Sequence, residues 1–190
     1  AIDDSDIQRR LLSRFLGLAG IRNRRKVILG QNADEILGFV DKVVNLVESN
    51  KDDKFLIIVD ESLDIMEGFA HKDTVSGSQC IAVIRDRLSE ENESRILTLI
   101  RSANDSNEDV AKYLQSAHAF MAKAPVQKDK VMELIEPLWV DRFSPHDDAV
   151  SSLSSSEEMS MMDSAMFEEE DFAFESYDLV AAVDVIDSFM

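Results

Sequence analysis

The sequence has little of what covalent cross-links and membrane spans require. Cys80 is the single cysteine among 190 residues, so the chain cannot form an internal disulfide. A reducing compartment suits such a chain best, and we expect a cytoplasmic, intracellular location. No apolar run approaches the roughly 20 residues that a membrane-spanning helix needs. The first residues, AIDDSDIQRR, also lack the apolar stretch of a signal peptide.

Basic residues are scarce at the C-terminal end of the chain. Residues 141–190 hold 14 acids and one base, whereas residues 1–140 hold 24 acids and 19 bases. We therefore expect a domain over 1–140 and an acidic, serine-rich tail over 141–190, disordered alone, whose last stretch could form a short helix. The tail's methionines and phenylalanines fit either a partner-binding segment or scattered hydrophobes. Neither part carries the basic face that nucleic-acid binding requires.

Strand and helix patterns alternate over the first 140 residues. Short apolar runs, several rich in β-branched residues, predict strands at 26–29, 55–59, 96–100 and 119–122. Helical spacing and capping patterns predict helices over 5–18, 32–48 and 79–88, from 106 onward, and over 131–138, where Pro137 is expected to distort or close the helix. Polar residues predict a loop at 69–78. This alternation predicts an α/β fold with a doubly wound parallel sheet.

Chemically active side chains stand where the predicted strands end. Asp3 and Asp4 open the chain, Asp60 follows one buried strand, Ser102 a second, and Lys123 a third. In such sheets the functional crevice lies at the carboxyl ends of the strands. Carboxylates that converge there need a cation, and oxygen ligands of this kind suit Mg²⁺. An ammonium and a hydroxyl nearby could neutralise and orient phosphoryl oxygens.

These pieces, in this order, resemble the receiver domain of two-component signalling, the phosphoacceptor module of response regulators and hybrid histidine kinases. The resemblance covers residues 1–140 and rests on four segments, AIDDS, KFLIIVDESLDIMEG, LTLIRSAND and HAFMAK. It implies a flavodoxin-like, five-stranded sheet in the order 2-1-3-4-5, with the first strand truncated at the N-terminus.

The resemblance also implies a metal site and a phosphoacceptor. Asp60 would accept a phosphoryl group from a phosphohistidine and become an aspartyl phosphate. Asp3, Asp4 and Asp60, with the main-chain carbonyl of Ser62, would hold Mg²⁺, and Asp4 would be a more direct ligand than Asp3. Lys123 would pair first with Asp60 and then with a phosphoryl oxygen.

Further roles follow from the same resemblance. Ser102 would bond the acyl phosphate, and Phe120 would be the aromatic switch that rotates inward when it does. Ser62 and Asn104 would help to set the lifetime of the phosphate. The partner would be a histidine kinase or a His-containing phosphotransfer protein. Such a domain catalyses its own phosphotransfer and dephosphorylation but is not a stand-alone metabolic enzyme.

The sequence departs from the receiver pattern in three places. Only two residues precede the acidic pair, so we expect a fragment of a longer polypeptide, such as the receiver end of a hybrid kinase. Ala124 follows Lys123 where the family has a proline, and Asp64 replaces another usual proline. These departures leave an alternative open: a receiver-like interaction module that does not turn over phosphate.

Overall fold

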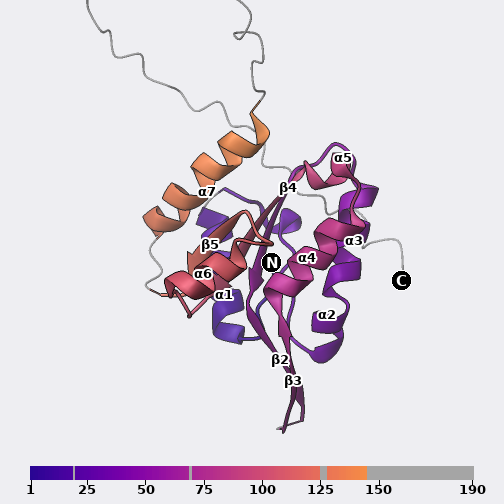
Figure 1. The fold of residues 1–190 in the computed structure, drawn as a ribbon, viewed down its shortest axis with the longest axis vertical. Helices are drawn as coiled ribbons and strands as arrows, with labels where there is room; N and C mark the ends of the chain where they lie inside the picture. The colour runs from indigo at the N-terminus through magenta and orange to yellow at the C-terminus, as the bar shows by residue number, and fades with distance from the viewer. Residues whose placement is uncertain (19, 69, 125–127, 145–190) are drawn as a thin grey trace, which may run out of the picture.

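The structure, a computed structural model, describes residues 1–18, 20–68, 70–124 and 128–144 (Figure 1). The helices are α1 (Asp6–Leu18), the 3-10 helix η1 (Asn23–Arg25), α2 (Ala33–Leu37), α3 (Phe39–Ser49), α4 (Gly77–Arg87), α5 (Glu90–Glu93), α6 (Asn107–Tyr113) and α7 (Lys128–Phe143). The strands are β1 (Phe55–Asp60), β2 (Ser62–Glu67), β3 (Ala70–Ser76), β4 (Ile96–Ser102) and β5 (Ala119–Ala122). None of the helices in these ranges has the length and apolarity to cross a membrane. Of the tail expected over 141–190, residues 141–143 belong to α7, and residues 145–190 lie outside the described ranges.

Three parallel strands form the central sheet, in the order β1-β4-β5. They confirm the strands predicted at 55–59, 96–100 and 119–122. The register of β1 on β4 ends with Asp60 opposite Arg101. All of β4 is buried, because it lies between two strands and helices cover both faces of the sheet.

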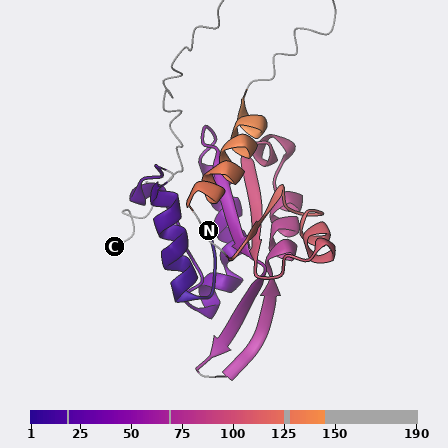
Figure 2. The same cartoon turned by 90° about the vertical axis from the view of Figure 1, so that its left-hand side faces the viewer.

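Helices cover the two faces of this sheet separately (Figure 2). One apolar cluster, on the side of α1 and α7, includes Leu12 and Leu99. A second cluster, on the side of α3 and α4, includes Ile81 and Ile100. Side chains two residues apart along a strand share a face, so alternate residues of β4 serve the two clusters. The α/β class with a parallel sheet is therefore confirmed.

The N-terminal segment lies alongside β1 without forming a full strand. Ile2 makes single parallel bridges with Leu29 on one side and Val59 on the other. The amide of Asp60 donates to the carbonyl of Ile2 at 3.1 Å, which ties the start of the chain to the end of β1. The strand predicted at 26–29 is reduced to one bridging residue. The five-strand order 2-1-3-4-5 is therefore not confirmed, since the sheet has three strands in the described part of the chain.

A β-hairpin replaces the loop predicted at 69–78, so that prediction is wrong. β2 and β3 pair antiparallel from Ser62 opposite Ser76 toward the tip near Gly68. The hairpin projects from the body of the domain (Figures 1 and 2). Residues 70–74 of β3 are exposed, so this strand lacks the apolar alternation by which strands are recognised in a sequence.

The structure confirms two predicted helix caps, but it differs from the prediction in where two helices break or end. The side chains of Asn32 and Ser106 accept from backbone N–H groups three residues on, as the capping patterns predict. The helix predicted over 32–48 is wrong as one element, because Gly38 separates α2 from α3. Pro137 does not close α7, which continues beyond it.

We predict that Gly77→Ala destabilises the fold by about 3 kcal/mol, because the added Cβ would clash with the backbone of β1. That Cβ would stand 2.1 Å from the carbonyl oxygen of Asp60, and backbone cannot move aside as a side chain can. The measurement is the free energy of unfolding in urea.

The matched control is Gly17→Ala in α1, whose Cβ would meet only the flexible end of Lys26. We expect this variant to be neutral or more stable by about 0.5–1 kcal/mol, since alanine suits a helix better than glycine. Equal stability of the two variants would contradict the role assigned to Gly77.

Candidate functional site

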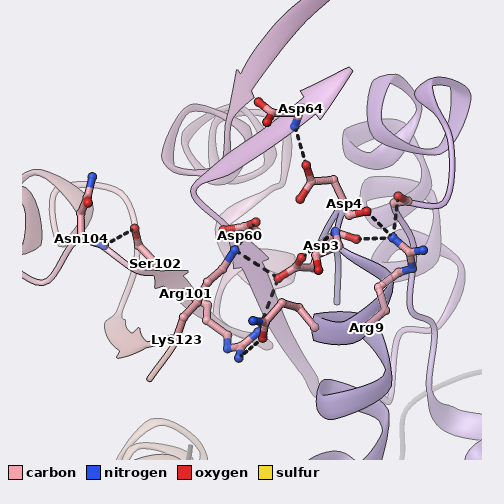
Figure 3. Close-up of polar contacts among 12 residues, drawn as sticks. Asp3, Asp4, Arg9, Asp60, Asp64, Arg101, Ser102, Asn104 and Lys123 are labelled. Carbon is pink, nitrogen blue, oxygen red and sulfur yellow. Dashed lines mark hydrogen bonds and ion pairs between the residues drawn. The ribbon is translucent and has the colours of Figure 1, made fainter. Parts of the chain in front are cut away.

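Three carboxylates meet at the carboxyl edge of the sheet (Figure 3). Asp3 and Asp4 follow the bridging residue Ile2, and Asp60 is the last residue of β1. One oxygen from each of the three lies within 4.8 Å of the others. Asp3 is 0% exposed and Asp60 is 2% exposed, so water screens neither charge. Like charges at this spacing repel unless cations lie among them.

Lys123 supplies one of those cations. Its Nζ donates to Oδ2 of Asp60 at 2.6 Å and lies 3.5 Å from Oδ2 of Asp3. The amide of Lys123 donates to the carbonyl of Ser102 at 2.8 Å, which holds the segment after β5 against the end of β4. Two strands and the N-terminal segment thus bring together the acids and the lysine that the sequence predicts.

Burial dominates the acid–base behaviour of the pocket. It raises the pKa of Asp60 to about 6, with help from the charges of Asp3 and Asp4 and against the hydrogen bond from Lys123. Burial also raises the pKa of Asp3, although Lys123 and Arg101 both oppose it. The carboxyl groups are therefore poorly solvated and gain from any added positive charge.

Arg9 holds the acidic turn in place by its backbone. Its Nη1 donates to the carbonyl oxygens of Asp3 at 3.0 Å, Asp4 at 2.7 Å and Gly30 at 2.9 Å. The amide of Ser5 donates to Oδ1 of Asp3 at 3.0 Å. Sequence reasoning assigned no role to Arg9, yet its side chain is only 13% exposed.

Glu61 ties the hairpin to the end of β1. Its Oε1 accepts from the hydroxyls of Ser76 and Ser78, and its Oε2 accepts from the amide of Ser78 at 2.9 Å. The amide of Gly77 donates to the carbonyl of Glu61 at 2.8 Å. The base of the hairpin is therefore fixed directly beside the carboxylate of Asp60.

Asp64 contributes its backbone to the pocket. Its amide donates to Oδ2 of Asp4 at 3.1 Å, whereas its carboxylate accepts from the hydroxyl of Thr74 at 2.8 Å and points away from the pocket (Figure 3). Asp64 replaces a usual proline of the receiver pattern, and its additional negative charge therefore lies on the hairpin rather than in the pocket.

Ser102 lies beside a different group of side chains. Its Oγ is 3.3 Å from Oη of Tyr113 and accepts from the amide of Asn104 at 3.1 Å. The ring of Tyr113 stacks on Phe120, with centroids 5.8 Å apart. Both rings belong to the apolar cluster on the side of α3 and α4. Within the described residues, the partners of the Ser102 hydroxyl do not include the three acids.

Two other residues singled out in the sequence occupy peripheral positions. Ser62 begins β2 with an exposed side chain, two residues after Asp60. Ala124, which stands where the receiver pattern has a proline, is exposed.

Sequence reasoning missed Arg101. This residue is 1% exposed, and its Nη1 lies 3.4 Å from Oδ2 of Asp3. Its Nη2 donates to Oε1 of Gln8 at 2.6 Å. Burial lowers the pKa of Arg101, and the charges of Asp3 and Asp60 oppose that effect. The signal in the sequence is a charged residue inside a mostly apolar strand, LTLIRS, because a buried charge requires a partner.

The free carboxylate oxygens decide whether a divalent cation fits. Both oxygens of Asp3 have partners, Ser5 on Oδ1 and two cations on Oδ2. Among the described residues, Asp4 and Asp60 each have a hydrogen-bond partner on one oxygen, which leaves the other oxygen for a ligand bond. Mg²⁺ is usually held by one or two carboxylates plus waters and phosphate oxygens, so the residues present fit this ion.

Comparisons with known proteins identify the fold. No family model matches the chain, and no curated protein matches it. A probable two-component system response regulator/GGDEF domain protein is 18% identical over 74% of this chain, with a TM-score of 0.51. This chain spans 48% of that protein.

Two other solved structures are similar. A fusion that carries the trimeric coiled coil of yeast Spc42 is 15% identical over 77% of this chain and 82% of its own, with a TM-score of 0.51. A CheY-like receiver domain protein from Methanospirillum hungatei JF-1 is 17% identical over 74% of this chain and 91% of its own, with a TM-score of 0.49. The chain has the fold of response-regulator receiver domains.

We predict that Asp60→Asn stabilises the metal-free protein at neutral pH by about 1–3 kcal/mol, because each unit of pKa shift corresponds to about 1.4 kcal/mol. The folded state holds the Asp60 proton more tightly than the unfolded chain, since its pKa rises from 3.8 to about 6. The free energy of unfolding therefore falls as pH rises across this window, and the variant lacks that fall.

The measurement is urea unfolding in the presence of a chelator, at about pH 4 and about pH 7.5. The control is Asp86→Asn, an exposed position on α4, which we expect to follow the wild type at both pH values. An Asp60→Asn variant that is less stable than the wild type at neutral pH would overturn the prediction.

Proposed function

We propose that the chain is a phosphoacceptor receiver domain, which takes a phosphoryl group from a phosphohistidine onto Asp60 in a phosphorelay. The observation that carries the proposal is the cluster of Asp3, Asp4 and Asp60 with the ammonium of Lys123, 2.6 Å from Asp60. This cluster lies at the carboxyl edge of a parallel sheet, where α/β folds bind their ligands. The receiver-like fold supports the same function.

Asp60 is the nucleophile in this proposal. A carboxylate oxygen of Asp60 attacks phosphorus while the bond from phosphorus to the imidazole nitrogen breaks, and the bonding pair returns to the imidazole. The product is an acyl phosphate. Bound Mg²⁺, held by Asp4, Asp60 and the carbonyl of Ser62, would offset the repulsion between the carboxylate and the phosphoryl oxygens.

Lys123 and Ser102 then serve the product. The ammonium of Lys123 pairs with Asp60 at 2.6 Å. Once Asp60 becomes an acyl phosphate, the same ammonium is close enough to pair with a phosphoryl oxygen. The hydroxyl of Ser102 leaves Tyr113 to donate to the phosphoryl group, and Phe120 moves into the space that opens. This pair of arrangements is a two-state element biased by one modification.

The wider context belongs to the same proposal. Residues 1–140 form the receiver domain, and residues 141–190 form an acidic tail. The partner is a histidine kinase or a His-containing phosphotransfer protein, in an intracellular setting. The domain supplies its own phosphotransfer and dephosphorylation chemistry, so it is not a stand-alone metabolic enzyme.

A second candidate is a receiver-like interaction module that does not turn over phosphate. The observation in its favour is that both oxygens of Asp3 are occupied by protein groups, together with Ala124 after Lys123. Such a module needs the cations of the pocket to hold the fold and has no use for Mg²⁺. Metal-dependent labelling of Asp60 distinguishes the two candidates.

We predict that Asp60→Asn abolishes acyl-phosphate formation from acetyl phosphate and Mg²⁺, because an amide cannot replace the carboxylate as the nucleophile. The measurement is the mass gain of one phosphoryl group on the intact protein, and its loss on treatment with hydroxylamine. The matched control is Asp64→Asn, whose side chain points away from the pocket (Figure 3). If Asp60→Asn is labelled as fully as the wild type, the acceptor is another residue.

We also predict that Ser102→Ala uncouples phosphorylation from the aromatic pair. Phosphorylation of the wild type should shift the ring NMR signals of Tyr113 and Phe120, because Ser102 breaks its 3.3 Å contact with Tyr113. The variant has no hydroxyl to withdraw, so its ring signals should change by less than half as much. The control is Ser106→Ala, at the exposed start of α6. Equal shifts in Ser102→Ala and the wild type would remove Ser102 from the switch.

A further inference from the structure

We propose that Arg101 is a positioning residue that holds Asp3 away from the cation, so that Mg²⁺ is bound by Asp4 and Asp60 rather than by three carboxylates. This inference rests on the proposed function, because it describes how the same pocket takes its metal. It assigns a role to a residue that the receiver pattern leaves unassigned and that the sequence presents only as a charge within a strand.

The register of the sheet places Arg101 beside the acceptor. Asp60 of β1 lies opposite Arg101 of β4, and Arg101 lies opposite Met121 of β5. Parallel neighbours in register project their side chains from the same face. Met121 and Leu99 belong to the apolar cluster on the side of α1, so the guanidinium extends along that face beneath the acidic turn, toward α1.

The contacts of Arg101 are directed at one acid. Its Nη1 is 3.4 Å from Oδ2 of Asp3, and its Nη2 is anchored by Gln8 of α1 at 2.6 Å. Ser5 occupies the other oxygen of Asp3. A carboxylate held on both oxygens and 0% exposed has to give up a protein partner before it can bind a metal directly. Asp4 and Asp60 face no such requirement.

The net charge of the pocket also supports this role of Arg101. Three carboxylates face two cations, Arg101 and Lys123, so the pocket retains one excess negative charge when all five groups are ionised. Without Arg101 the excess would be two, and a dication would bind more tightly. Arg101 therefore weakens Mg²⁺ binding while it removes Asp3 from the set of ligands. After phosphorylation the same guanidinium helps to balance the additional charge of the phosphoryl group.

The test compares single and double variants of the full 190-residue chain, with Mg²⁺ affinity measured by titration calorimetry and the metal-induced rise in melting temperature as a second readout. Arg101→Met alone should bind Mg²⁺ about tenfold more tightly, because it adds one excess negative charge and frees Asp3. Asp3→Asn with Arg101→Met removes the ion pair as a unit and should bind Mg²⁺ within about threefold of the wild type. Asp4→Asn should weaken binding by at least about tenfold.

Two controls support this comparison. Arg87→Met removes a positive charge from an exposed pair with Asp41 on the surface and should leave Mg²⁺ affinity unchanged. Because Arg101→Met leaves Asp3 buried with Lys123 as its only cation, Asp3→Asn with Arg101→Gln provides a second balanced variant. Circular dichroism and urea unfolding check that each variant is folded.

The outcomes separate this inference from the function on which it rests. A balanced double variant that loses Mg²⁺ binding as severely as Asp4→Asn makes Asp3 a direct ligand and overturns the role of Arg101, while phosphorylation of Asp60 in the wild type leaves the proposed function standing. A wild-type protein that binds no Mg²⁺ overturns both. Tighter binding in Arg101→Met together with near-wild-type binding in the double variant supports the inference.

Discussion

The structure depends on the balance of buried charge at the carboxyl edge of the sheet. Asp3 and Asp60 are almost completely removed from water, and each would be strongly destabilising alone. Lys123 contacts both, and Arg101 contacts Asp3. Removing one of the cations leaves a buried carboxylate uncompensated and costs far more than the group contributes as a whole. The pocket is therefore a cooperative unit, and its chemistry cannot be separated from the stability of the edge that carries it.

Close approaches of the backbone bring these charges together. Gly30 has φ +107, and a Cβ there would stand 2.3 Å from the carbonyl of Asp3, so the segment beside the N-terminus can come close only with glycine at this position. Gly77 plays the matching part against Asp60 on the other side. Arg9 then gathers the carbonyl groups of the acidic turn. Side chains thus set the charge of the pocket, while backbone packing sets the distances.

The sequence predicted the parts of this protein whose signals are local. Buried strands and capped helices are recognised from neighbouring residues, and the acids and Lys123 were placed at strand ends for that reason. The hairpin was missed because residues 70–74 are exposed on β3 and read as a polar loop. Arg101 was missed because its partners, Asp3 and Gln8, are distant in the chain. Arg9 was missed because its partners are backbone carbonyl groups, which the sequence pattern does not reveal. A periodic pattern shows which face a residue occupies, but it does not show whether a hydrogen-bond acceptor lies next to that residue in the fold.

Alternation along β4 divides the site between the two faces of the sheet. Arg101 projects with Leu99 toward the side of α1, where the acids and Lys123 lie. Ser102 projects with Ile100 toward the other side, where Tyr113 and Phe120 pack. Adjacent residues of one buried strand therefore contact the charged pocket and the aromatic pair. In the proposed function, phosphorylation of Asp60 therefore acts on the other face of the sheet through Ser102, which contacts Tyr113 of α6, and through Phe120 of β5, which stacks on that ring.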